Sequence, residues 1–101
     1  MPVIVVHGPA REDADTLLYR VNLTVSAALG LGPADVHSMF VPATAAATGT
    51  EADSPWPTAL LHGGARPAEL MAAAISDVSV VLAEHFGTEP DRVWVQWVVR
   101  D

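Results

Sequence analysis

The chain has 101 residues, of which half are hydrophobic and 17% are charged, and its formal net charge is −7. This length fits one small domain, and this composition is typical of a packed globular protein rather than a disordered one. The acidic balance argues against contact with a phosphate backbone, so nucleic acid is not an expected partner. The absence of cysteine excludes disulfides, thiolate nucleophiles and thiolate-bound zinc.

No segment approaches the roughly 18 apolar residues that span a bilayer, and the first residues lack the pattern of a secretion signal. We therefore expect no membrane partner and a cytoplasmic protein. All five basic residues are arginines, so any anionic ligand must be held by one or more of them. They are Arg11, Arg20, Arg66, Arg92 and Arg100.

The first half of the chain predicts a strand, a helix and a strand. Residues 2–7 are a short β-branched run without polar alternation, which is typical of a strand buried on both faces. Residues 12–29 carry apolar side chains at helical spacing, with acidic residues in the first turn and glycine after the end. Residues 36–41 predict the second strand.

The second half follows the same plan after a long connection. Residues 42–57 are rich in Ala, Thr and Pro without periodicity, and a loop of this length in a small domain is often functional. Residues 58–62 predict a strand, and Pro67 suits the first position of a helix that runs to about residue 86. Residues 93–99 predict the last strand, which completes the order βαβ-loop-βαβ.

The two halves are also alike in sequence. Residues 5–11, VVHGPAR, recur as residues 60–66, LLHGGAR, in each case between a predicted strand and a predicted helix. Residues 33–41 recur more loosely as residues 90–98. This repetition indicates a duplicated βαβ unit.

Two right-handed βαβ units side by side give a four-stranded α/β sheet with two helices on one face. We therefore predict a single domain, 1–101, with repeat units at about 2–42 and 57–101. The other face of the sheet would expose apolar side chains unless further subunits covered it, so we expect an oligomer. A ferredoxin-like α+β domain has the same element order and is the competing architecture, but its second and third strands usually form a direct antiparallel pair.

The Met1-Pro2 start carries the strongest chemical signal. Methionine is normally removed when proline follows, which would expose Pro2 as a secondary amine. At the head of a buried strand, desolvation would lower the pKa of this amine below the roughly 8 of an ordinary α-amino group. Such an amine can act as a general base near neutral pH. The alternative is that Met-Pro is merely a permissive start.

With Pro2 at its head, the duplicated pattern resembles the tautomerase superfamily, whose members share an amino-terminal proline base and the βαβ unit. The resemblance covers nearly the whole chain. Residues 90–93, PDRV, followed by an aromatic strand resemble the macrophage migration inhibitory factor branch, whereas residues 62–66 and 77–80 with Trp94 resemble the dehalogenase branch. The resemblance implies a homotrimer and a cofactor-independent keto-enol tautomerase of a small 2-keto or enol carboxylic acid.

The resemblance also assigns residues. Pro2 matches the catalytic base. Arg66 matches one of two arginines that bind the substrate carboxylate in the dehalogenase branch, whereas Gly63 stands where the other would be. Arg11 resembles the helix-start arginine of 4-oxalocrotonate tautomerase, displaced by one residue, and a guanidinium near a helix N-terminus suits a carboxylate. For each arginine the alternative is a surface ion pair with Glu12, Asp13 or Glu69.

His37 and Gln96 are further candidates for substrate binding. His37 stands at the place of a second arginine in 4-oxalocrotonate tautomerase, although a half-buried strand histidine is more often structural. Gln96 replaces a tyrosine of the dehalogenase branch, so water activation for dehalogenation is poorly supported. We expect no metal, because the repeat-related His7 and His62 lack neighbouring ligands at a suitable spacing.

Other interpretations stay open at the level of sequence. The aromatic residues are more typical of a core or a subunit interface than of a cofactor site, although Trp56 could line a cavity. They are Phe40, Trp56, Trp94 and Trp97. Within the superfamily, a dehalogenase, hydratase or decarboxylase acting on a similar acid is the alternative. A non-enzymatic partner-binding protein and a ferredoxin-like ligand-binding module are the alternatives from other classes.

Overall fold

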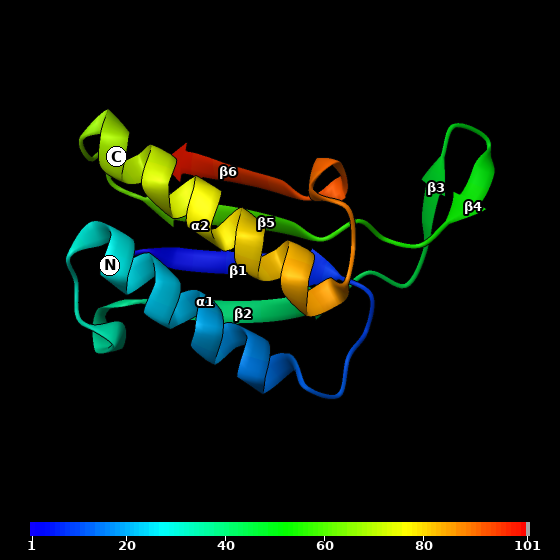
Figure 1. The fold of residues 1–101 in the computed structure, drawn as a ribbon, viewed down its shortest axis with the longest axis horizontal. Helices are drawn as coiled ribbons and strands as arrows, with labels where there is room; N and C mark the ends of the chain where they lie inside the picture. Colours follow the sequence, from blue (N-terminus) through cyan, green and yellow to red (C-terminus); the bar gives the residue numbers. More distant parts are fainter. Residues whose placement is uncertain (101) are drawn as a thin grey trace.

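The computed structural model describes residues 1–100 and has the element order strand-helix-strand twice, with a hairpin between the two units (Figure 1). The first unit contains β1 (Val3–Gly8), α1 (Ala14–Leu29) and β2 (His37–Pro42). The second contains β5 (Thr58–Gly63), α2 (Ala68–Phe86) and β6 (Trp94–Val99). The predicted two-unit α/β architecture is confirmed, and Pro67 lies just before the second helix rather than at its first residue.

The main sheet has the strand order β2-β1-β5-β6. β1 and β2 are parallel, β5 and β6 are parallel, and the two units meet where β1 pairs antiparallel with β5. β2 is an edge strand that never pairs with β5, so the direct pairing typical of a ferredoxin-like domain is absent from the described residues. The ferredoxin-like alternative is therefore wrong.

Both helices pack on the same face of this sheet, in front of it in Figure 1. Each helix buries side chains four residues apart, which lie on one side of a helix. The fully buried core residues from the helices are Leu17, Val21, Val25, Ala74, Val78 and Leu82. Ile4, Val6, Ala59 and Leu61 complete the core from the two central strands. Among residues 1–100, no helix is long and apolar enough to span a bilayer.

The opposite face of the sheet carries no covering element in the described chain. Alternate residues of each strand point to this open face, and most of them are apolar. They are Val3, Val5 and His7 on β1, His37, Met39 and Val41 on β2, Thr58, Leu60 and His62 on β5, and Trp94, Gln96 and Val98 on β6. The prediction that the first strand is buried on both faces is thus wrong for a single subunit, because only its helix side is fully buried.

The long connection is not an irregular loop. It contains a short hairpin, β3 (Ala46–Thr48) and β4 (Glu51–Asp53), which projects from the end of the sheet opposite the chain termini (Figure 1). Gly49 adopts φ 62° at the turn, a conformation that glycine takes without steric cost. Strands of three residues are too short for the alternation that would predict them from sequence.

The pseudo-symmetry of the fold reveals a structural counterpart of Pro2. The carbonyl of Pro2 accepts a hydrogen bond from the backbone N–H of His37 at 3.1 Å, and the carbonyl of Pro57 accepts one from Trp94 at 3.0 Å. Both prolines are buried and directly precede a central strand. Pro57 therefore occupies the position of Pro2 in the second unit, with its nitrogen always in a peptide bond.

Candidate functional site at the amino-terminal end of the sheet

Pro2 lies at the end of the sheet where β1 begins and where β5 and β6 end. Because β1 and β5 are antiparallel with Val3 opposite His62, Pro2 faces Gly63 across the strands. A Cβ atom built on Gly63 would lie 3.8 Å from the Cα of Pro2. The Pro2 side chain is fully buried, whereas the preceding Met1 is 76% exposed. Removal of Met1 would therefore expose the Pro2 nitrogen without removing a core side chain.

Arg66 lies at the same end of the sheet, two residues before α2 begins at Ala68. Its side chain is half-buried, and its Nε–H is shielded from solvent without an acceptor among the described residues. A buried donor without a partner costs about 1–3 kcal/mol. The positive end of the α2 dipole adds to the guanidinium charge. An anionic oxygen would thus be favourable here.

Trp97 closes the space beside Gly63. A Cβ on Gly63 would lie 2.9 Å from Cζ2 of Trp97 and 3.5 Å from its Cη2, so the indole occupies the room that a side chain at 63 would need. The Nε1–H of Trp97 is also buried without an acceptor in the described part of the chain. Sequence reasoning placed Trp97 in the core or an interface and missed its contact with this end of the sheet. The signal that could have predicted this contact was Gly63 itself, because the resemblance implies an arginine at this position and a glycine leaves room for a neighbouring ring.

Gln96 is not in this cluster within one subunit, and His37 joins it only through its backbone N–H, which donates to the carbonyl of Pro2 at 3.1 Å. His37 begins β2 beside Val3, and Gln96 pairs with Leu60 in the middle of the sheet. Strand alternation places both side chains on the open face, and both are exposed. The Pro2 ring belongs to the helix side, where it is buried. Within one subunit, the Gln96 side chain and the Pro2 ring therefore lie on opposite faces of the sheet.

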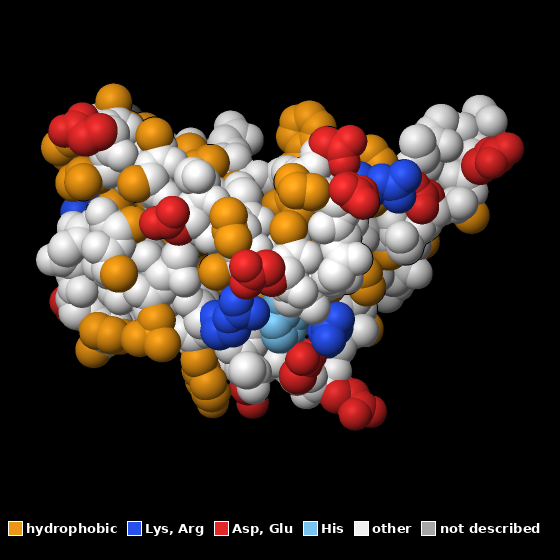
Figure 2. Space-filling view, in the orientation of Figure 1, with side chains coloured by type: hydrophobic (Ala, Val, Ile, Leu, Met, Phe, Trp, Pro, Cys, Tyr) orange, Lys and Arg blue, Asp and Glu red, His pale blue; other side chains and the backbone are white. Residues whose placement is uncertain are grey.

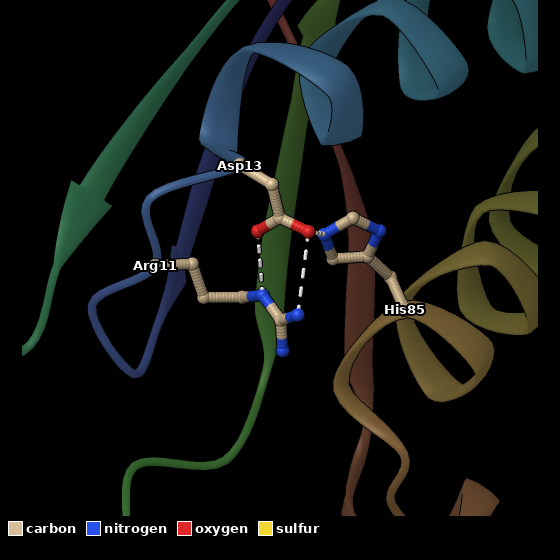
Figure 3. A network of polar contacts seen from close by, with 3 residues as sticks. All are labelled: Arg11, Asp13 and His85. Atoms are coloured by element: carbon tan, nitrogen blue, oxygen red, sulfur yellow. Dashed lines mark hydrogen bonds and ion pairs between the residues drawn. The ribbon is translucent and has the colours of Figure 1, made fainter.

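Arg11 lies at the opposite end of β1 and already has a partner (Figure 3). Its Nε donates to Oδ1 of Asp13 at 2.8 Å and its Nη2 to Oδ2 at 3.3 Å. His85 Nε2 approaches Oδ2 of the same carboxylate at 3.2 Å, and the guanidinium lies 5.4 Å from the centre of the Phe86 ring. The hydrogen bond from Arg11 is the main reason that the pKa of Asp13 falls to about 2. The alternative of a surface ion pair with Asp13 is thus present in the structure.

Of the three remaining arginines, Arg20 and Arg92 also contact side chains, whereas Arg100 lies near Pro2. Arg20 Nη2 donates to Glu84 Oε2 at 3.0 Å across the two helices, and Arg92 lies 5.6 Å from the centre of the Trp56 ring. In Figure 2, the basic side chains in the middle of the helix face each touch acidic ones. Arg100 follows β6, and its backbone N–H donates to the carbonyl of Gly63 at 2.7 Å. Arg100 is therefore close to the Pro2 end.

A separate cavity of about 590 Å³ lies between the hairpin and the end of the open face that is farthest from Pro2. Its mainly apolar lining includes His7, Thr58, Trp94 and Trp56, so Trp56 does line a cavity as the sequence allowed. Neither Pro2 nor Arg66 contributes to it. Residues 1–100 hold no group of three or more His, Asp or Glu side chains that could bind a metal.

Comparison with solved structures defines the fold class. A wild-type fused 4-OT that forms an asymmetric trimer matches 97% of this chain and 85% of its own, with a TM-score of 0.85 and 18% identity. Pt0534, crystallised after inactivation by 2-oxo-3-pentynoate, matches 98% and 84%, with a TM-score of 0.81 and 21% identity. Macrophage migration inhibitory factor of Toxoplasma gondii matches 98% and 90%, with a TM-score of 0.76 and 18% identity.

A member of the cis-3-chloroacrylic acid dehalogenase family and malonate semialdehyde decarboxylase match the same fold, with TM-scores of 0.78 and 0.73. No protein-family model matches the sequence, and no curated protein matches it significantly. These proteins all belong to the tautomerase superfamily, so the chain has the tautomerase-superfamily fold that the sequence predicted.

Proposed function

We propose that the chain, once Met1 is removed, is a cofactor-independent keto-enol tautomerase of small 2-keto or 2-enol carboxylic acids. The observation that carries the proposal is the position of Pro2, buried opposite Gly63 at the end of the sheet where Arg66 presents a buried donor without an acceptor among residues 1–100. In this fold class, solved structures include tautomerases, a dehalogenase-family member and a decarboxylase. Tautomerisation needs the fewest groups of these reactions, namely one base and one anion-binding residue.

The reaction moves one proton from oxygen to carbon. The neutral Pro2 nitrogen accepts the enol proton, the electrons of the O–H bond form the C=O bond, and the resulting ammonium returns the proton to the terminal carbon of the former double bond. Arg66 binds the carboxylate and stabilises the negative charge of the enolate between these steps. Desolvation lowers the pKa of an amine and so raises its neutral fraction near pH 7, which suits both proton transfers.

The pH dependence of ketonisation tests this proposal. We expect protein with a confirmed Pro2 terminus to ketonise phenylenolpyruvate or 2-hydroxymuconate, with kcat/KM rising with pH through an apparent pKa below roughly 8. The rate rises because only the neutral amine accepts a proton. A correctly processed chain that ketonises no 2-enol acid would refute the tautomerase proposal, and hydration, dehalogenation or decarboxylation of a similar acid would then remain to be assayed.

We further propose that the open face of the sheet is buried in a homotrimer, since solved fused 4-OT structures of the same fold are trimers. We expect a Leu60→Glu substitution, in the centre of this face, to convert trimers to smaller species, because it places a charge among the apolar side chains. Leu23→Glu is the matched control, since Leu23 is 58% exposed on the surface of α1. Sedimentation of both variants distinguishes them, and a stable wild-type monomer at micromolar concentration would contradict the assembly.

A further inference from the structure

We propose that a groove on the helix side of the molecule docks a basic amphipathic helix of another protein. The groove lies between α2 and η2 (Pro90–Arg92), the short 3-10 turn that precedes β6. It has a volume of about 430 Å³ and is lined by Ser76, Ser79, Val80, Ala83, Glu84 and Pro90. This proposal goes beyond the tautomerase function and does not depend on the chemistry of Pro2.

The groove exists because the side chains along its floor are short. Ser76, Ser79 and Ala83 are spaced three and four residues apart, so they share one side of α2. The Oγ of Ser79 donates to the carbonyl of Ile75 at 2.7 Å, so this hydroxyl needs no partner from the groove. The volume of the groove falls within the range of about 300–1,000 Å³ that is usual for binding sites. It can therefore receive the large apolar side chains of a docked helix.

Val80 provides an apolar anchor at the edge of the groove. Its side chain is 54% exposed, although a single exposed apolar residue is ordinary in a soluble protein. The neighbouring groove distinguishes Val80, because a partner that covers this side chain also reaches the floor formed by the small residues. Leu23 on α1 is similarly exposed, at 58%, but does not line the groove.

Acidic residues border the groove on the side of α2. Glu84 is part of its wall, and Asp77 lies three residues before Val80 on the helix surface, where it is exposed. Glu84 shares its charge with Arg20, whereas Asp77 forms no ion pair within residues 1–100. On the helix face in Figure 2, acidic side chains lie around hydrophobic ones over α2 and the turn that follows it.

Acidic residues also border the groove on the side of η2. Glu89 and Asp91 flank Pro90 in sequence, and both are exposed. Neither forms an ion pair in the part of the chain that the structure describes. Arg92, the cation of this turn, lies 5.6 Å from the centre of the Trp56 ring. The groove is thus apolar along its floor and negative on both sides.

This charge selects the kind of occupant. A chain with a formal net charge of −7 repels nucleic acid, anionic membranes and a second copy of the same acidic surface. A cationic amphipathic helix instead places apolar residues, spaced three or four apart, in the groove and directs lysine or arginine to the carboxylates. The helices lie on the face of the sheet opposite the open face, so the groove stays accessible in the proposed trimer (Figure 1).

Binding of designed peptides of about 15 residues, a length at which isolated helices become stable, tests the proposal. The probe contains leucine on one side of the helix and lysine on the other, and its control has the same composition in an order that forms no apolar side. We expect the amphipathic peptide to bind the full chain with a Kd below about 100 μM and the control at least about tenfold more weakly. Protein that retains Met1 should bind equally well, because Pro2 lies outside the groove.

Val80→Arg and Leu23→Arg are a matched pair of variants. Each replaces an exposed apolar side chain on a helix, and each changes the net charge equally. We expect Val80→Arg to raise Kd by about tenfold or more and Leu23→Arg to change it by no more than about threefold. Ala83→Leu should also weaken binding, because it fills the groove without a change of charge.

The amide resonances of ¹⁵N-labelled protein show where the peptide lies, and we expect the largest changes within residues 76–93. Four results would each overturn the proposal: no binding of the amphipathic peptide, equal affinity for the control peptide, equal effects of Val80→Arg and Leu23→Arg, or changes concentrated on the open face. None of these results bears on the tautomerase function, which the kinetic experiments test separately.

Discussion

Replacement of Pro2 by alanine is expected to lower kcat for ketonisation by about a hundredfold or more. A positioned general base typically accelerates a reaction by roughly 10²–10⁴-fold. Alanine also permits removal of Met1, so the variant keeps a terminal amine. This amine is primary and lacks the ring that holds Pro2 in its buried position opposite Gly63. Both the basicity and the placement of the nitrogen would change. Steady-state kinetics on chains of confirmed mass would measure the loss.

Pro57→Ala is the control that the fold itself provides. Pro57 is buried before β5 as Pro2 is before β1, and its carbonyl accepts an equivalent hydrogen bond from Trp94. Its nitrogen is never free, so we expect the variant to retain kcat within about threefold once the folded fraction is measured. Wild-type protein extended by an uncleaved residue before Pro2 should be silent, because an amide nitrogen has no basic lone pair. Full activity of Pro2→Ala would remove proline from the mechanism.

Arg66→Ala is expected to reduce kcat/KM by roughly thirtyfold or more. A charge-assisted hydrogen bond to a carboxylate is worth about 2 kcal/mol or more, and each 1.4 kcal/mol corresponds to about a factor of ten. Arg66→Lys should recover only part of this loss, since lysine keeps the charge but lacks the planar fork. Measurement of kcat and KM for each variant would show whether carboxylate binding or the chemical step is affected.

Arg20→Ala is the appropriate comparison for Arg66. Arg20 forms a solvent-exposed ion pair with Glu84 on the helices, and such pairs contribute less than about 1 kcal/mol. We expect its loss to change kcat/KM by no more than about threefold. Arg100 is as far from Arg66 in the sequence as Arg20 is from Arg66 in order of magnitude, but it is a poor control. Its backbone N–H donates a hydrogen bond to the carbonyl of Gly63. Similar losses for Arg66→Ala and Arg20→Ala would refute the carboxylate clamp.

The fold was accessible from sequence because its signals are local and repeated. The spacing of Leu17, Val21 and Val25 defines the buried side of α1, and Gly30 and Gly87 end the two helices with positive φ angles of 70° and 62°. Duplication then predicts two similar βαβ units side by side in one sheet, with both helices on the same face. The hairpin at residues 46–53 was missed, because its strands are too short and too rich in alanine to show alternation.

The site was less accessible because it depends on which strand ends meet. The antiparallel pairing of β1 with β5 puts Pro2 with Gly63 and Arg66 and sends Arg11 to the other end of the sheet. The repeated motifs VVHGPAR and LLHGGAR therefore end in different surroundings. The partners of Arg11 and the position of the Trp97 indole come from α2 and β6, which no local pattern around these residues specifies.

The central claim is that Pro2 carries a neutral secondary amine in the active protein, and a pH titration of protein labelled with ¹⁵N-proline measures this amine most directly. Of the eight prolines, only a terminal Pro2 can give an amine resonance, because the other seven nitrogens are in peptide bonds. We expect one proline nitrogen to titrate with a midpoint below roughly 8 that coincides with the apparent pKa of kcat/KM. An active preparation without a titrating proline nitrogen, or with a midpoint unrelated to the kinetic pKa, would contradict the assignment of Pro2 as the base.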